Sequence, residues 1–293
     1  MSLMYYLEKP TVNKILISDD TITRFTKNIR FLTANIKLGS QKIDDSFAIL
    51  NEIEQLILSD MLTPEEEIAF ISSPENISII NNCRKLNIIV DGLIEKQLSD
   101  CIINKSLIED FKTCANPIYQ SYLERFESIA NCESKIISKY KNDNIIFIGS
   151  GQFPISAINY FRKLKSNITI VEQNEELAKK SEIVLSNLGY LDKIKVINSK
   201  GQDLLFDNFD IVVVGVLAVP KEKIINSILS SAKPNTKIIM RTTYGCRTLL
   251  CEPLNFEEVS GLKLIESYIA RGNQTLSTLL FSITKTKLPY DNI

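Results

Sequence analysis

The residues after Asn144 contain a regular succession of short apolar runs, and helical stretches separate them. Runs that are hydrophobic at nearly every position predict strands buried on both faces, as in a parallel sheet covered by helices. The alternation therefore predicts an α/β fold with a doubly wound sheet and right-handed crossovers. The expected strands are Ile145–Ile148, Ile168–Val171, Ile194–Ile197, Ile211–Val214 and Ile238–Met240, and the expected helices cover roughly 155–164, 175–188 and 221–231.

The earlier residues show helical periodicity and almost no strand signal. One apolar helical face includes Phe47, Leu50 and Ile53. Thr63-Pro64-Glu65 and Ser73-Pro74-Glu75 both have the pattern of a helix start, and longer helices are expected over about 77–103 and 117–129. We therefore expect an all-α N-terminal helical bundle over residues 1–138 and a Rossmann-like domain over residues 139–293.

The C-terminal tail has the pattern of two further strands. The stretches Glu266–Ala270 and Thr275–Ile283 are expected to pair as antiparallel strands at the end of the sheet. This ending is typical of class I methyltransferase-type sheets. The sequence therefore predicts that the C-terminal half is a Rossmann-like domain of that type.

The chain contains no histidine, which excludes Ser-His-Asp and Cys-His catalysis and removes the most common zinc ligand. The six cysteines form no C-x-x-C pair, so no metal site is expected. The net charge of −1, without a basic stripe, argues against nucleic acid as a partner. No apolar run is long enough for a membrane span and no leader is evident, so we expect a cytoplasmic protein with reduced thiols.

A glycine turn follows the first expected strand and opens a helix. Gly149, Ser150 and Gly151 allow a sharp turn and a close approach to a ligand. Glu172 ends the second strand, where an acid can bind both ribose hydroxyls. Pro154 stands near the place of the third glycine of the dinucleotide fingerprint, so a nucleoside such as S-adenosylmethionine fits better than NAD. The alternative is a structural turn followed by a solvated acid.

Two further strand ends are candidates for the wall of the same site. Asp203 follows the third strand, where such folds often contact adenine, or it is a turn acid. The fourth strand is followed by an apolar loop that includes Leu217 and Ala218. Ligands of open α/β sheets bind outside the carboxyl ends of the strands, and an apolar loop suits a thioether and a methylene chain. Plain packing is the alternative for this loop.

Three of these segments together resemble the nicotianamine synthase family. They are Phe147–Pro154, Leu217–Lys221 and Arg241–Arg247, and their order and spacing match over most of the chain. The resemblance implies transfer of the 3-amino-3-carboxypropyl arm of S-adenosylmethionine to an amine, with release of methylthioadenosine. Archaeal and plant members condense three such units into nicotianamine, and bacterial relatives add one unit to an amino acid. It implies no cofactor or metal beyond S-adenosylmethionine as donor substrate.

The resemblance also implies roles for particular residues. It places Glu95 and Tyr122 in the reaction chamber, as a proton-accepting carboxylate and its tyrosine partner. A guanidinium fork suits a carboxylate, so Arg241 and Arg247 are candidates for binding a carboxylate of the substrate, and a solvent-facing side chain is the alternative for Arg247. The remaining candidates are Phe153, Pro154, Thr242 and Tyr244 for the donor, and Tyr119 and Ser277 for the acceptor.

Two other functions are compatible with the sequence. An S-adenosylmethionine-dependent methyltransferase with a helical substrate domain would leave Glu95 and Tyr122 incidental. A non-catalytic binding protein would retain only the nucleotide fold. In each case we expect small-molecule partners and a monomer or homodimer.

Overall fold

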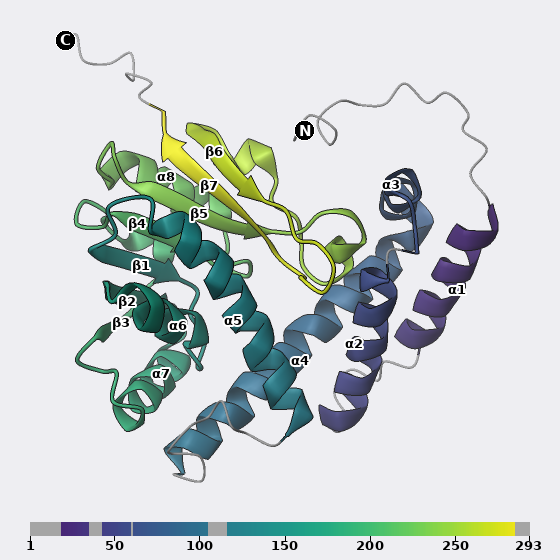
Figure 1. The fold of residues 1–293 in the computed structure, drawn as a ribbon, viewed down its shortest axis with the longest axis horizontal. Helices are drawn as coiled ribbons and strands as arrows, with labels where there is room; N and C mark the ends of the chain where they lie inside the picture. The colour runs from purple at the N-terminus through teal and green to yellow at the C-terminus, as the bar shows by residue number, and fades with distance from the viewer. Residues whose placement is uncertain (1–18, 35–42, 60, 105–115, 285–293) are drawn as a thin grey trace.

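The computed structural model describes residues 19–34, 43–59, 61–104 and 116–284. Helices make up the first part of the described chain, and a sheet with its covering helices makes up the second (Figure 1). The helices of the first part are α1 (Asp19–Ala34), α2 (Ile43–Leu58), α3 (Pro64–Ser72), α4 (Ile77–Ile103) and α5 (Pro117–Ile137). The predicted order of a helical part followed by an α/β part is therefore confirmed.

A single seven-stranded sheet with the order β3-β2-β1-β4-β5-β7-β6 forms the second part. Strands β1 to β5 pair in parallel, and β7 pairs antiparallel with both β5 and β6. This confirms the Rossmann-like, class I methyltransferase-type fold. The strands are β1 (Asn144–Ile148), β2 (Asn167–Glu172), β3 (Ile194–Asn198), β4 (Ile211–Val214), β5 (Lys237–Thr242), β6 (Leu262–Tyr268) and β7 (Ser277–Ile283).

The helices of the α/β part lie where the sequence predicts them. They are α6 (Ile155–Leu164), α7 (Glu175–Asn187) and α8 (Lys221–Ser231). Successive side chains of a strand point to opposite faces, and the two faces of this sheet have different coverings. Ile145 and Phe147 belong to a core cluster that extends into α4 and α5, whereas Ile146 and Ile148 belong to a second cluster with residues of α8.

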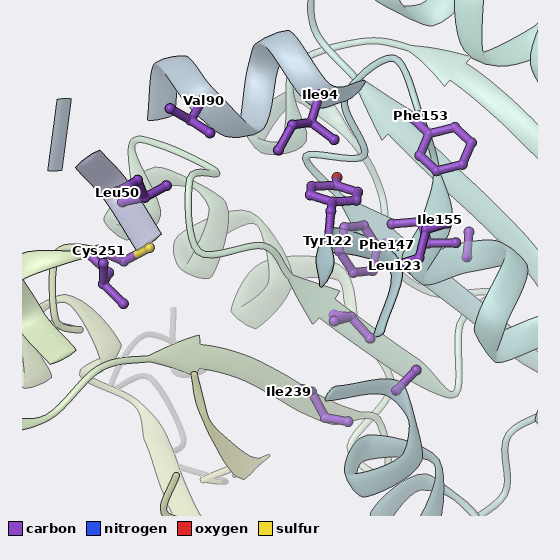
Figure 2. Packing of buried hydrophobic residues seen from close by; sticks show 14 of the residues in the cluster. Leu50, Val90, Ile94, Tyr122, Leu123, Phe147, Phe153, Ile155, Ile239 and Cys251 are labelled. Atoms are coloured by element: carbon purple, nitrogen blue, oxygen red, sulfur yellow. The ribbon is translucent and has the colours of Figure 1, made fainter. Parts of the chain in front are cut away.

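The larger cluster joins the helical part to the sheet (Figure 2). Leu50 of α2, Val90 and Ile94 of α4 and Tyr122 of α5 belong to the same buried cluster as Phe147 of β1. Helix α4 contacts both α2 and α7, so it spans the helical part and reaches the α/β part. The core therefore continues across the predicted boundary at residues 138 and 139, and the division into two domains stays a prediction.

Side-chain caps start α3, α5 and α7, whereas α4, α6 and α8 begin without one. The Thr63 hydroxyl accepts from the Glu66 amide at 3.3 Å, and a Glu66 carboxylate oxygen accepts from the Thr63 amide at 2.8 Å, which is a complete capping box. The similar pattern at Ser73 does not start an α-helix. It leads into a 3₁₀ turn, η2 (Pro74–Asn76), the Ser73 side chain forms no capping hydrogen bond, and α4 begins after it.

Candidate active site

A pocket of about 310 Å³ lies at the carboxyl ends of β1, β2 and β4, and residues of α4 and α5 form its other wall. Its position follows the general rule for ligands of open α/β sheets. Most of the residues singled out in the sequence line it, and they come from both parts of the chain. These are Glu95, Tyr122, Gly149, Ser150, Gly151, Phe153, Pro154, Glu172, Leu217, Ala218 and Arg241.

The donor turn, Gly149–Gly151, has a backbone that only glycine adopts easily. Gly149 has φ +84° and Gly151 has φ +67°. A Cβ at Gly149 would lie 3.2 Å from the Ala218 Cβ, so the turn packs directly on the loop after β4. The Ser150 hydroxyl is buried and has no hydrogen-bond partner in the described part of the chain. A buried polar group without a partner is costly, so this hydroxyl indicates a ligand at the turn.

Glu172 is buried at the end of β2 and is fixed by backbone amides. Its Oε2 accepts from the Gly151 amide at 3.0 Å, and its Oε1 accepts from the Asn174 amide at 2.9 Å. Each ionised carboxylate oxygen has a second lone pair. Glu172 therefore holds the donor turn in place and retains acceptor capacity for the hydroxyls of a ribose.

Glu95 projects from α4 over the donor turn and pairs with Tyr122 of α5. The Tyr122 hydroxyl donates to Glu95 Oε1 at 3.0 Å, and Figure 2 shows this hydroxyl pointing toward α4 beside Ile94. A Cβ at Gly151 would lie only 2.5 Å from Glu95 Oε2. The missing side chain of Gly151 therefore makes room for the carboxylate, so both parts of the chain meet at this point.

The surroundings of Glu95 favour its protonated form. Burial raises the pKa of this carboxyl to about 8, and the negative charges of Asp91 and Glu172 also raise it, against hydrogen bonds from Tyr122 and the Gln152 backbone that lower it. Burial and the adjacent Glu95 raise the pKa of Tyr122 well above its usual value. Tyr122 is thus a stable hydrogen-bond donor to a carboxyl that exchanges its proton near neutral pH.

Arg241 has an internal carboxylate partner, in place of the substrate carboxylate expected from the sequence. Its Nε and Nη2 donate to the two Glu133 oxygens at 2.9 and 2.8 Å, and Nη2 also reaches Ser156 at 3.1 Å. Both side chains are almost fully buried; burial lowers the pKa of Arg241, but the charges and hydrogen bonds of Glu133 and Tyr160 together raise it above its usual value. Tyr160 and Thr278 also donate to Glu133, at 2.5 and 3.2 Å. Arg241 therefore links α5, α6 and the sheet behind the pocket.

Arg247 is likewise engaged inside the protein. Its Nε donates to the Gln274 carbonyl at 2.7 Å and its Nη2 to the Gly272 carbonyl at 2.8 Å. The side chain is buried and lies outside the residues that line the pocket. The alternatives raised from the sequence were a substrate carboxylate or solvent, and the structure shows backbone carbonyls instead.

The remaining candidates also lie outside the pocket-lining set. Asp203 is exposed in a 3₁₀ turn, η4 (Gly201–Asp203), so its contact with adenine stays a prediction. The Thr242 hydroxyl accepts from the Leu254 amide at 2.8 Å, and the Ser277 hydroxyl accepts from the Ala270 amide at 3.0 Å. Tyr119 donates to Gln97 at 2.5 Å, and Tyr244 precedes the 3₁₀ turn η5 (Gly245–Leu249).

Sequence reasoning missed the polar residues at the helical end of the pocket. Asn87 and Asp91 of α4 line it, as does Arg125 of α5. The signal was present in the spacing, because Asn87 and Asp91 precede Glu95 at intervals of four residues and Arg125 follows Tyr122 by three. If Glu95 and Tyr122 lie on helices that face a pocket, Asn87 and Asp91 lie on the same helix face as Glu95, and Arg125 lies on the same helix face as Tyr122.

The described residues contain no group of three or more histidine, cysteine, aspartate or glutamate side chains that could hold a metal ion. Over the same residues, no helix has the length and apolar character needed to cross a membrane.

The sheet order, the glycine turn after β1 and the acid that ends β2 define the fold of S-adenosylmethionine-dependent transferases. A family profile described as nicotianamine synthase protein matches residues 17–285. The chain therefore belongs to the nicotianamine synthase family. It is a transferase of alkyl groups other than methyl, with S-adenosylmethionine as its donor substrate.

Solved structures of the same kind share the fold over nearly the whole chain. MtNAS in complex with MTA and tNA superposes with a TM-score of 0.76 at 21% identity, covering 92% of this chain and 100% of that chain. A glutamate-to-glutamine mutant of MtNAS in complex with S-adenosylmethionine gives a TM-score of 0.75 at 20% identity, covering 92% and 99%. A search of curated proteins gives no match.

Proposed function

We propose that the chain transfers the 3-amino-3-carboxypropyl group of S-adenosylmethionine to an amine and releases methylthioadenosine, giving nicotianamine or a related metallophore. The observation that carries this proposal is the Glu95–Tyr122 pair, held directly over the donor turn inside the pocket. A proton acceptor at this point serves an amine nucleophile, which must lose a proton when it forms a new bond to carbon. MtNAS, a structure of the same fold, binds S-adenosylmethionine and MTA.

The α/β end of the pocket suits the nucleoside of the donor. The donor turn allows close backbone approach, Glu172 offers carboxylate oxygens to the ribose hydroxyls, and Ser150 supplies a hydroxyl that has no partner among the described residues. Leu217 and Ala218 give the loop after β4 an apolar surface for the thioether side. The chain therefore has groups suited to each part of the nucleoside.

The chemistry requires one displacement at an already activated carbon. The amine nitrogen attacks the γ-methylene, a C–N bond forms, and the C–S bond breaks with its electron pair returning to sulfur. The sulfonium becomes the neutral thioether of methylthioadenosine, and the proton of the amine passes to Glu95. A carboxylate whose conjugate acid has a pKa of about 8 is matched to an amine far better than an ordinary glutamate.

The proposed division into residues 1–138 and 139–293 gives each part of the chain one half of this reaction. The helical part supplies Glu95 and Tyr122, and the α/β part supplies the donor turn and Glu172. Transfer then depends on how the two parts place the amine relative to the γ-methylene and the methyl of the same sulfonium.

The proposed group transfer is tested by the nucleoside that is released. Incubation with S-adenosylmethionine, with and without amino acids, is expected to yield methylthioadenosine together with products heavier by an aminobutanoate unit, both identified by mass spectrometry. S-adenosylhomocysteine with methylated acceptors would show a methyltransferase and refute the proposal. Binding of methylthioadenosine without turnover of any acceptor would show a binding protein.

Removal of the acid at the end of β2 is expected to weaken the nucleoside site. Glu172→Ala should lower the affinity for methylthioadenosine about tenfold or more, because charge-assisted hydrogen bonds to the ribose are lost and the donor turn loses an anchor. Calorimetry measures this affinity without turnover. Glu175→Ala is the matched control, because Glu175 lies at the exposed start of α7 and pairs with Lys179. Equal affinity in the Glu172 variant would place the ribose elsewhere.

A further inference from the structure

A second carboxylate of the helical part meets a glycine of the α/β part. Gly245 has φ +55°, and a Cβ on it would overlap Oε2 of Glu67, which α3 carries. Glu67 Oε1 accepts from the Cys246 amide at 3.2 Å, and the buried Cys246 thiol also donates to this carboxylate. The contact has the same form as that of Glu95 with Gly151, because in both cases a glycine without a side chain makes room for a glutamate.

The start of α3 fixes the backbone that carries Glu67. Thr63 and Glu66 form the capping box of this helix, and the Glu67 amide donates to the Thr63 carbonyl at 2.9 Å. Phe70 of the same helix is buried, and its ring packs edge-on against Phe25 of α1 with centroids 5.1 Å apart. The Glu67 carboxylate therefore projects from an element that is itself held in the helical part.

The 3₁₀ turn η5 is buried and is held by several elements. All of its residues, 245–249, are buried, and the turn contacts α2, α3 and α4. Arg84 of α4 donates through Nε to the Thr248 carbonyl at 2.8 Å. Arg247 donates to two carbonyls of residues 269–276, the loop between β6 and β7. The turn η5 therefore connects the helical part to that loop.

Two segments joined to η5 reach the pocket. Leu250 and Cys251 follow η5 directly and line the pocket, and Thr275 and Leu276 of the loop between β6 and β7 line it as well. We call these four residues the η5 wall. The Asn87 side chain of α4 donates to the Cys251 sulfur at 3.7 Å, so the η5 wall borders the helical side of the pocket.

We propose that Glu67 is a positioning residue for the transfer reaction, which acts through Gly245 and Cys246 to hold η5 and, through η5, the η5 wall. Glu67 lies outside the pocket lining, so its effect on the reaction is indirect. This inference rests on the proposed function, because the proposed transfer is the reaction that the η5 wall shapes. A displacement of about 1 Å in such a wall can cost about a hundredfold in rate.

The nucleoside end of the pocket has supports of its own. Glu172 and the donor turn are held by hydrogen bonds among Glu172, Gly151 and Asn174, at the ends of β1 and β2. Removal of the Glu67 carboxylate should therefore affect turnover and leave the binding of the nucleoside unchanged. This separation is what distinguishes a positioning role from a general effect on folding.

The experiment compares Glu67→Ala and Glu67→Gln with the unaltered protein. Turnover is the total nucleoside released from saturating S-adenosylmethionine in the presence of the common amino acids, identified by mass spectrometry. Calorimetry gives the Kd of methylthioadenosine, and thermal unfolding gives Tm. Glu65→Ala is the matched control, because Glu65 lies in the same helical turn and is exposed.

Glu67→Ala is expected to lose turnover about tenfold or more, with the Kd of methylthioadenosine within about twofold, which also shows that the variant is folded. Glu67→Gln should keep turnover within about threefold, because its amide oxygen still accepts from the Cys246 amide. Glu65→Ala should match the unaltered protein. A lowered Tm with unchanged turnover in Glu67→Ala would assign Glu67 to folding alone and overturn the inference, and so would an equal weakening of methylthioadenosine binding.

A second variant tests the route through Gly245. Gly245→Ala should lose turnover by itself, because its Cβ displaces the Glu67 carboxylate. In the Glu67→Ala background the same change meets no carboxylate, so the double variant should be no slower than about twofold below Glu67→Ala. Losses that multiply in the double variant would contradict this route. Failure of the proposed function gives a different result, namely S-adenosylhomocysteine released by the unaltered protein.

Discussion

Glu95→Gln is expected to bind S-adenosylmethionine with a Kd within about threefold of the unaltered protein and to lose about 10²- to 10⁴-fold in turnover, the usual contribution of a positioned base. Glutamine has the size of glutamate, and its amide oxygen still accepts from Tyr122. It cannot accept the proton of the attacking amine. Glu124→Gln, on the exposed face of α5, is the control and should keep full activity. Unchanged turnover in Glu95→Gln would remove Glu95 from the reaction.

The same residue gives an expected pH dependence. Burial and nearby negative charge raise the pKa of Glu95 to about 8 in the protein without ligand, so the carboxyl is mostly protonated at pH 7 and becomes a base as the pH rises through 8. Asp91, Tyr122 and Glu172 are titratable groups that act on it, and Asp91 is itself paired with Arg125. kcat/KM should rise over this range.

An acceptor amine loses its proton in a similar range, so the rate alone does not identify the group. The direct measurement is NMR of the protein with ¹³C-labelled glutamate carboxyl groups. One carboxyl resonance should titrate near pH 8, and the same resonance should be missing in Glu95→Gln. An ordinary acidic titration of that resonance would contradict the expected environment of Glu95.

Gly151→Ala is expected to abolish most turnover through geometry alone. Its φ of +67° adds backbone strain of about 1–2 kcal/mol to any residue with a Cβ. The new Cβ would lie 2.5 Å from Glu95 Oε2, so the carboxylate must leave its position and its bond to Tyr122. We expect turnover to fall about a hundredfold or more, because a displacement of about 1 Å can cost that much.

Gly189→Ala separates strain from displacement. Gly189 has φ +72°, and a Cβ there would meet nothing within 4 Å. The Gly189→Ala variant should lose about as much free energy of unfolding as backbone strain costs Gly151→Ala, and it should keep its turnover. Thermal unfolding and steady-state kinetics measure the two effects. Equal turnover in the two alanine variants would show that Glu95 does not depend on the space above Gly151.

The elements of the α/β part could be predicted closely because their signals are local. Strand β4 and helices α6 and α8 have the predicted limits, since continuous apolar runs and turn residues bound them. The tail strands were displaced: β6 begins at Leu262 and ends at Tyr268, before the predicted end. Their limits depend on the antiparallel pairing of β7 with β5 and of β6 with β7, which the local sequence does not show. Helix α5 likewise runs eight residues beyond the predicted end at Ile129, to Ile137.

The donor side of the site could be predicted from sequence, whereas the roles of the arginines could not. A glycine turn after a strand and an acid at the end of the next strand have fixed places in this fold. The partner of an arginine has no such fixed place. Arg241 is paired with Glu133, which lies 108 positions away, and Arg125 is paired with Glu54, 71 positions away. Only the packing of helices on the sheet and of helices on one another brings these charges together.

The Glu133–Arg241 pair also limits how the molecule can move. Glu133 belongs to the helix that carries Tyr122, and Arg241 belongs to a central strand, so a hinge that swung α5 away from the sheet would separate two buried charges. Uncompensated buried charges cost several kcal/mol. A hinge motion that opens the site by moving α5 away from the sheet is therefore costly. The rim of the pocket beside the loop after β4 remains open to solvent, because Leu217 and Val219 line the pocket and are about half exposed.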